Sequence, residues 1–314
     1  MSKESVTLLG DDGFSVTVLA YGASLCSIRV PTAKGTVDVL LSYADYAAYR
    51  NDRYYLGATV GRYANRIGGG CFMLSGVQYL LDRNEVVPGN CLHGGRGGLH
   101  SVTWCLHEDK AARKVECCYL SRHGDQGFPG ELDLTVGYQI IDGQSLLIEF
   151  TASSDRESVL NLANHAYFNL NADGSTINNH EVRLHCDAYT PVNDAKIPTG
   201  CVADVAGSRF DLRHPMTIGS AVFDTNFVVA GEAGRLRPAA QVFSPESGIT
   251  LDIATTQHGL QFYTGDYLDV PFRARAGFCF EAQNYPDAPN QPTFPSARIA
   301  PDRPYSERTI YRFN

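Results

Sequence analysis

The stretch Leu134-Thr135-Val136-Gly137-Tyr138-Gln139-Ile140, followed by Asp142-Gly143 and then by Leu146-Leu147-Ile148-Glu149-Phe150, is the clearest structural signal in the sequence. Both runs are rich in the β-branched, aromatic and large apolar residues that suit a half-buried strand. Asp-Gly is a preferred pair for a type I′ turn. The stretch therefore predicts an antiparallel β-hairpin.

The same alternation of short strands and turns continues along the chain in both directions. A second hairpin is expected at 71–81 around Ser75-Gly76, with a glycine turn at 68–70, and a short helix at 43–50. Further strands are expected at 14–21, 115–120, 182–186, 249–253 and 309–313. No linker or low-complexity tract divides the chain. The pattern predicts an all-β protein, a large antiparallel β-sandwich that forms one domain over residues 1–314.

Amino-acid composition and net charge limit the kinds of binding partner that this protein can have. The chain has 314 residues, 44% of them hydrophobic, and a net charge of −8, which disfavours nucleic acid and anionic membranes. The N-terminus lacks the apolar run of a signal peptide, and no apolar stretch is long enough to span a bilayer. Nine cysteines without a C-x-x-C spacing indicate reduced thiols. We expect a cytoplasmic protein, a monomer or homodimer, whose partner is a small molecule.

The segment Gly277-Phe278-Cys279-Phe280-Glu281-Ala282-Gln283-Asn284-Tyr285-Pro286-Asp287 places one carboxylate in an apolar strand. Successive side chains of a strand point to opposite faces, so Phe278, Phe280 and Ala282 are expected in the core. Cys279, Glu281 and Gln283 then share the other face. Because an isolated buried charge is costly, Glu281 is either a salt-bridged core acid or a general base at an open face.

A second segment, at 161–170, has the same design. Its even positions are largely apolar, with Leu162, Ala166, Phe168 and Leu170, whereas its odd positions carry Asn161, His165, Tyr167 and Asn169. His165 is either a core histidine that orders this asparagine-rich segment or a proton donor and acceptor. An acid and a histidine on two such strands could form a base–acid pair.

Both segments resemble the catalytic motifs of the aldose 1-epimerase family, the galactose mutarotases. Shorter matching stretches recur in the family's order along nearly the whole chain, at 61–67, 92–95, 127–130, 190–192, 197–200, 224–227, 261–265, 290–292 and 294–296. The resemblance implies the large β-sandwich of galactose mutarotases, with the site on a concave sheet face. It also implies an isomerase that opens and recloses the ring of a free hexose by general acid–base chemistry, with no metal and no cofactor.

By this resemblance Glu281 is the general base and His165 the general acid. A base must take the proton of the C1 hydroxyl while an acid protonates the ring oxygen, and the two roles reverse on closure. The implied sugar-binding residues are Asn65, Arg66, His93, Tyr167, Asp224 and Gln261. Without the family, Arg66 would be a loop-bracing arginine, His93 a turn residue beside glycines that permit close approach to a ligand, and Asp224 a turn former.

Two other functions remain open at this point. A hexose-6-phosphate 1-epimerase would share the fold and the His165–Glu281 pair, but would need more basic side chains than the implied set contains. Arg62 and Arg96 are near site segments in sequence, although the sequence does not place them. A non-catalytic sugar-binding or sensor domain would not need both His165 and Glu281. We therefore expect a mutarotase acting on free galactose and glucose.

Overall fold

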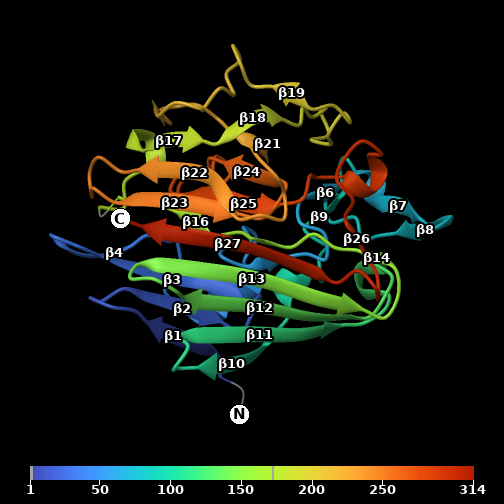
Figure 1. Ribbon diagram of the computed structural model, residues 1–314, viewed down its shortest axis with the longest axis horizontal. Coiled ribbons are helices and arrows are strands. Elements are labelled where there is room, and N and C mark those ends of the chain that lie inside the picture. Colours follow the sequence, from blue (N-terminus) through green and yellow to red (C-terminus); the bar gives the residue numbers. More distant parts are fainter. Residues whose placement is uncertain (1–2, 172) are drawn as a thin grey trace.

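The computed structural model describes residues 3–171 and 173–314, and antiparallel strands dominate it (Figure 1). The largest sheet contains, in spatial order, β10 (Cys105–Asp109), β11 (Lys114–Ser121), β12 (Leu132–Ile140), β13 (Ser145–Ser154), β27 (Tyr305–Phe313), β23 (Thr250–Thr255), β22 (Arg237–Phe243), β17 (Glu181–Leu184) and β20 (Met216–Thr217). A second sheet contains β16 (Tyr167–Phe168), β25 (Phe278–Gln283), β24 (Gly259–Tyr263), β21 (Asp224–Val229), β18 (Cys186–Tyr189) and β19 (Ala203–Asp204).

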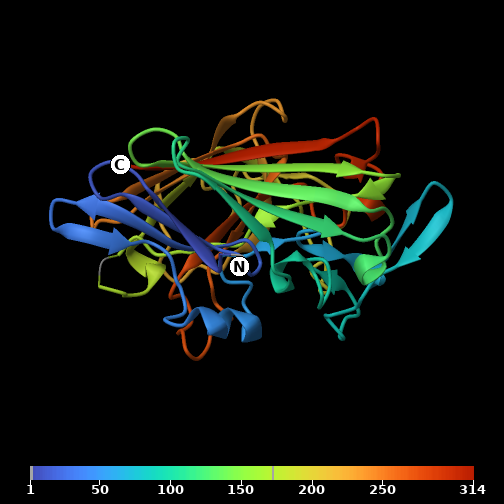
Figure 2. The ribbon, with the colours of Figure 1, turned by 90° about the horizontal axis from the view of Figure 1, so that it is seen from below.

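A third sheet and four short strand pairs complete the strand list for the described residues. The third sheet contains β1 (Ser5–Leu9), β2 (Ser15–Leu19), β3 (Ser24–Thr32) and β4 (Gly35–Asp38). The pairs are β5 (Thr59–Val60) with β15 (Ala163–Asn164), β6 (Arg66–Ile67) with β9 (Cys91–Leu92), β7 (Cys71–Leu74) with β8 (Val77–Leu80), and β14 (Ser158–Val159) with β26 (Arg298–Ile299). Seen from below, the largest sheet forms one layer, and β1–β4 lie in the layer facing it (Figure 2). The predicted all-β sandwich is confirmed.

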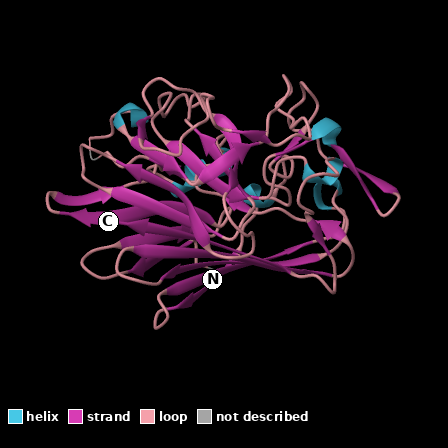
Figure 3. Ribbon diagram, turned by 45° about the horizontal axis from the view of Figure 1, so that its top comes forward, coloured by secondary structure: helices cyan, strands magenta, loops and turns pink. Residues whose placement is uncertain are grey.

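Within the described residues, helix is confined to short 3-10 segments of three to six residues (Figure 3). They are η1 (Tyr46–Asn51), η2 (Gly68–Gly70), η3 (Leu99–Ser101), η4 (Asp125–Gly127), η5 (Ile177–Asn179) and η6 (Ala288–Asn290). The short helix expected at 43–50 is η1, which begins after Asp45, whose carboxylate accepts the N–H of Ala47 at 2.9 Å. None of the helices in the described part of the chain is long and apolar enough to cross a bilayer.

The two predicted hairpins form, but only one has the expected turn. Ser75 and Gly76, with φ of 49° and 79°, make the two-residue loop between β7 and β8. In the β12–β13 hairpin the Asp142 carbonyl instead accepts the N–H of Ser145, and Gly143 alone has a positive φ, of 41°. The expected type I′ turn on Asp142-Gly143 was therefore wrong, because the loop holds one more residue than that turn allows.

The strand expected at 182–186 is two strands of different sheets. β17 ends at Leu184 and belongs to the largest sheet, whereas β18 begins at Cys186 and belongs to the second sheet. Between them the N–H of His185 donates to the carbonyl of Ala239 at 2.8 Å. The alternation of apolar Val182, Leu184 and Cys186 with polar residues continues across the crossing because both strands face the same core, so the sequence pattern did not show it.

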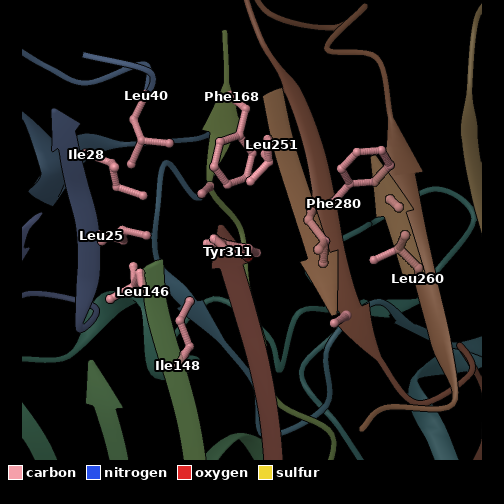
Figure 4. Packing of buried hydrophobic residues seen from close by; sticks show 14 of the residues in the cluster. Leu25, Ile28, Leu40, Leu146, Ile148, Phe168, Leu251, Leu260, Phe280 and Tyr311 are labelled. Carbon is pink, nitrogen blue, oxygen red and sulfur yellow. The ribbon is translucent and has the colours of Figure 1, made fainter. Parts of the chain in front are cut away.

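One apolar cluster joins the three large sheets. Leu25 and Ile28 of β3 meet Leu146 and Ile148 of β13, while Phe280 of β25 faces the same interior (Figure 4). The core face of β25 consists of Phe278, Phe280 and Ala282, as predicted. The opposite face of the second sheet is consequently free to carry polar side chains.

Arg62, which the sequence left unplaced, is a buried structural residue. Its guanidinium donates to the carbonyls of Ser121 (3.0 Å), Pro129 (2.8 Å) and Gly130 (2.9 Å), and also to that of Arg122. It is 2% exposed and does not line the cavity described below. Arg62 therefore binds together the loops at 121–130.

Replacing Arg62 by methionine should destabilise the fold. The change leaves several buried carbonyls without a donor, so we expect the free energy of unfolding to fall by about 3 kcal/mol or more. Urea denaturation followed by circular dichroism measures the change. Arg96→Met is the matched control, because Arg96 is exposed and pairs with Asp82, and it should cost about 1 kcal/mol or less. Equal losses for the two variants would contradict the structural role of Arg62.

Candidate active site

A cavity of about 190 Å³ opens over the polar face of the second sheet. It is lined by Arg53, Tyr54, Tyr55, Asn65, Arg66, Leu92, His93, His165, Tyr167, Lys196, Asp224, Tyr263, Tyr267 and Glu281. All of the predicted site residues except Gln261 are in this set. Segments up to 228 residues apart in sequence, from Arg53 to Glu281, therefore meet at one small, largely polar pocket.

The strand register brings the polar residues of the sheet together. Glu281 on β25 lies opposite Gln261 on β24, and Asp224 on β21 lies opposite Tyr263 on β24. The alternate residues of these strands, such as Phe280 and Phe262, are in the core. The period of two thus gives the sheet one apolar and one polar face.

Glu281 and His165 form a buried pair at the floor of the cavity. The Nε2 atom of His165 is 3.7 Å from Oε1 of Glu281, and the two residues are 5% and 2% exposed. Oε2 of Glu281 has no hydrogen-bond partner among the described residues. A buried carboxyl oxygen without a partner is costly in a purely structural role. It is suited to a ligand that supplies the missing hydrogen bond.

Burial moves the pKa values of this pair in opposite directions. Loss of hydration, with a further contribution from the charge of Asp224, raises the pKa of Glu281 to about 8, although Arg66 opposes the shift. Burial lowers the pKa of His165 to about 4. Between these values the pair holds one proton, and the resting proton is on Glu281 rather than on His165. A base and an acid that share one proton fit a reaction in which each group both gives and takes it.

His93 and Asn65 hold each other at the ends of two short paired strands. Asn65 precedes β6 and His93 follows β9, with φ of 63° and 50°. The N–H of His93 donates to the carbonyl of Asn65, and the N–H of Asn65 donates to Nδ1 of His93, both at 3.1 Å. Because a backbone N–H can only donate, Nδ1 of His93 is the acceptor and Nε2 carries the proton. Burial also lowers the pKa of His93 well below its usual value, so it is a neutral donor.

The side chain of Arg66 is oriented by the carboxylate of Glu85, which was not among the predicted residues. Nε and Nη2 of Arg66 donate to Oε2 and Oε1 of Glu85, each at 2.9 Å. A bidentate pair of this kind fixes the plane of the guanidinium. Nothing in the local sequence marks Glu85 as the partner, because the β6–β9 pairing and the turn before β9 bring it to Arg66.

Asp224 is held between a lysine and a glutamine. Nζ of Lys196 donates to Oδ2 at 2.7 Å, and Nε2 of Gln261 donates to Oδ1 at 2.7 Å. Burial alone would raise the pKa of Asp224, but the charges of Lys196 and Arg66 and these hydrogen bonds lower it below the usual value. Asp224 is therefore an ionised acceptor. Gln261 lies beneath it, outside the cavity lining, and positions Asp224 in this structure.

Aromatic rings complete the walls of the cavity. The ring centroid of Tyr55 is 4.6 Å from that of His93, and the centroid of Tyr167 is 5.1 Å from that of His165. Tyr267 is exposed at the rim, where Nζ of Lys196 lies 4.7 Å from its ring centroid. Tyr55, Tyr267 and Lys196 were not predicted. Lys196 directly precedes the matched stretch at 197–200, which is the one sequence signal that could have drawn attention to it.

His93, His165 and Glu281 are close enough together to raise the question of a metal. One potential ligand atom of each lies within 4.8 Å of the others. A metal would need an unprotonated ring nitrogen of His93. Nδ1 of His93 is already the acceptor of the Asn65 N–H, which leaves the proton on Nε2. The hydrogen bonding of His93 thus makes this cluster poorly suited to a metal ion.

Two other expectations about the site change with the structure. A Cβ on Gly94 would lie 2.0 Å from the carbonyl oxygen of Gly61, so this glycine allows two backbone segments to approach, not a ligand. Arg96 does not line the cavity, and its guanidinium pairs with Asp82. The additional cations at the cavity are Lys196 and Arg53 instead.

The chain matches known proteins over almost its whole length. Residues 4–312 match the family model for aldose 1-epimerase. Galactose mutarotase from Rattus norvegicus is 37% identical over 98% of this chain and 93% of that protein, and aldose 1-epimerase from Escherichia coli (strain K12) is 33% identical over 98% and 94%. Among solved structures, a GalM/aldose epimerase homologue from C. elegans superimposes with a TM-score of 0.92 at 27% identity, covering 100% of this chain and 99% of that chain.

The raised pKa of Glu281 predicts a pH-dependent cost to stability. The folded protein keeps a proton that an unfolded glutamate, with a pKa of 4.5, releases, so stability falls as pH rises from about 4.5 to about 8. Glu281→Gln cannot ionise. Its stability relative to the wild type should therefore rise with pH through this window, on the order of 1 kcal/mol for each pH unit.

Thermal unfolding at pH 5 and pH 9 tests this effect. The Tm of Glu281→Gln minus that of the wild type should be larger at pH 9 than at pH 5. Glu232→Gln removes a carboxylate that is 69% exposed and should show no such increase. A Tm difference for Glu281→Gln that does not change with pH would contradict the assigned burial cost.

Proposed function

The chain belongs to the aldose 1-epimerase family and interconverts the α and β anomers of hexoses, and we propose that Glu281 and His165 carry the proton transfers of this reaction. The observation that supports the assignment is the buried pair 3.7 Å apart, both of whose residues line the cavity, with one Glu281 oxygen that no described residue hydrogen-bonds. The alternative of a silent sugar-binding domain gives no reason for burying this acid.

Ring opening uses the arrangement of the pair in which its one proton is on His165 and Glu281 is a carboxylate. The Glu281 carboxylate takes the proton of the C1 hydroxyl, and the His165 imidazolium gives its Nε2 proton to the ring oxygen as the C1–O5 bond breaks. The open-chain aldehyde rotates about C1–C2. On closure Glu281 returns a proton to the former carbonyl oxygen, and His165 takes the proton of the O5 hydroxyl. The pair therefore carries one proton before and after every step, as its pKa values require.

The remaining cavity residues bind and orient the sugar in this proposal. His93 and Arg66 offer N–H donors whose orientations are fixed by Asn65 and Glu85. Asp224 offers carboxylate oxygens to sugar hydroxyls. Tyr167 packs beside His165, and the ring of Tyr55 packs against those of His93 and His165. A rigid set of donors and acceptors of this kind holds the ring so that C1–OH and O5 face the pair.

The charges at the cavity favour a free hexose over a hexose 6-phosphate. Arg66 is paired with Glu85 and Lys196 with Asp224, while Arg53 lies 3.6 Å from Asp269 in an exposed pair. Each cation described at the cavity thus already has a carboxylate partner. A phosphate dianion would have to displace one of these carboxylates to be compensated. We therefore infer that the substrates are uncharged aldoses such as galactose and glucose.

Polarimetry of freshly dissolved α-D-galactose and α-D-glucose tests the function and both catalytic roles. The wild type should accelerate the approach to anomeric equilibrium. Glu281→Gln and His165→Asn should each lower kcat by about 10²–10⁴-fold, because each removes one group of a general acid–base pair. Glu307→Gln and His258→Asn make the same chemical changes outside the cavity and should keep wild-type kcat. Near wild-type turnover by Glu281→Gln would exclude it as the base.

The pH dependence of kcat/KM reports the proton count of the pair. Activity should be highest between the two pKa values, because only there does the pair hold one proton. Above about pH 8 the last proton is lost and no acid remains, so kcat/KM should fall. Below about pH 4 both groups are protonated and no base remains. A rate, corrected for the spontaneous reaction, that is still rising between pH 8 and 9.5 would contradict this account.

A further inference from the structure

His165 has a second partner, on the side of the imidazole that faces away from Glu281. Nδ1 of His165 lies 3.6 Å from Sγ of Cys279, a contact made entirely inside the protein. Cys279 is two residues before Glu281 on β25 and is 0% exposed. The same strand therefore presents both a carboxyl to Nε2 and a sulfur to Nδ1.

The proposed proton transfers constrain which ring nitrogen of His165 is permanently protonated. The reaction removes a proton from Nε2 and later returns one to it. The neutral imidazole formed in between must therefore carry its proton on Nδ1, and that N–H needs an acceptor inside the protein. Sγ of Cys279 is the group in hydrogen-bond contact with it.

We propose that Cys279 is a positioning residue whose sulfur accepts the Nδ1–H of His165 and so keeps Nε2 as the nitrogen that exchanges protons with the sugar. This inference rests on the proposed role of His165. It gives His165 the opposite tautomer to His93, whose Nδ1 faces a backbone N–H. The two neighbouring histidines then differ in function for a local reason: Nε2 of His93 can only donate, whereas Nε2 of His165 can also accept.

An uncharged sulfur also suits the proton balance of the pair. Histidines that act in proton transfer are often held through Nδ1 by a carboxylate or a carbonyl, which favours the imidazolium. Burial raises the pKa of the Cys279 thiol well above its usual value, so the sulfur stays uncharged. It orients the ring without stabilising the imidazolium as an anion would. His165, once protonated, therefore gives its proton up readily to the ring oxygen.

Substitution at Cys279 separates this role from simple packing. Cys279→Ala removes the acceptor, and kcat should fall by about threefold to tenfold, the worth of one net hydrogen bond, with KM within about twofold. Cys279→Ser retains an acceptor and should recover most of the lost kcat. Cys117→Ala removes a thiol that is equally buried, at 0% exposure in β11, and should leave kcat unchanged. Equal kcat in all three variants and the wild type would overturn the proposal.

Nuclear magnetic resonance of ¹⁵N-histidine-labelled protein tests the tautomer without reference to activity. Long-range ¹H–¹⁵N correlation should show neutral His165 protonated on Nδ1 and neutral His93 protonated on Nε2, with the His165 signals assigned by their loss in His165→Asn. Cys279→Ala should show a mixture of tautomers at His165. A wild-type His165 protonated on Nε2 would overturn the role of Cys279, even if His165→Asn abolishes turnover. Conversely, if His165→Asn retains turnover, the proposed catalytic role fails whatever the tautomer.

Discussion

The burial of one carboxyl group, Glu281, is the constraint on which the site depends. A glutamate in water is a carboxylate near neutral pH, whereas this one is buried, and burial raises its pKa to about 8. This environment exists because successive residues of β25 point to opposite faces of the sheet. Phe278 and Phe280 pack into the core, and Glu281 is on the opposite face. Burying Oε2 of Glu281 without a hydrogen-bond partner destabilises the fold, and the packing of three large sheets around one apolar cluster offsets this cost.

Many residues that carry the family resemblance support the site without lining the cavity. Asp287, at the end of the segment that contains Glu281, accepts the N–H of Gly68 at 2.9 Å, while its own N–H donates to the carbonyl of Arg66 at 2.8 Å. Asn290 and Gln291 donate to its carboxylate at 2.7 and 2.8 Å. The loop after β25 is thereby tied to the strand that presents Arg66. Motif residues around Glu281 thus fix the position of a binding residue from another part of the chain.

Charge pairing at the cavity is the basis for the proposed preference for an uncharged ligand. Lys196 and Arg66 each hold a carboxylate, and both lower the pKa of Asp224. The pocket therefore offers oriented donors and acceptors but little uncompensated charge. The two neighbouring histidines, His93 and His165, differ in the group that contacts Nδ1. For His93 this group is a backbone N–H, and for His165 it is a thiol.

The sequence by itself determined the fold class, the two faces of the strand at 278–283 and the identity of the acid–histidine pair, because strand periodicity and short motifs are local properties. Its resemblance to one family supplied the binding set, and all of that set except Gln261 lines the cavity. Only the tertiary structure decided that Arg62 is structural, that Glu85 aims Arg66 and that Lys196 holds Asp224. These contacts join segments whose separation in sequence carries no periodic signal. The pKa shifts of Glu281 and His165 have the same origin, since burial is a property of the packed molecule and no residue type reveals it.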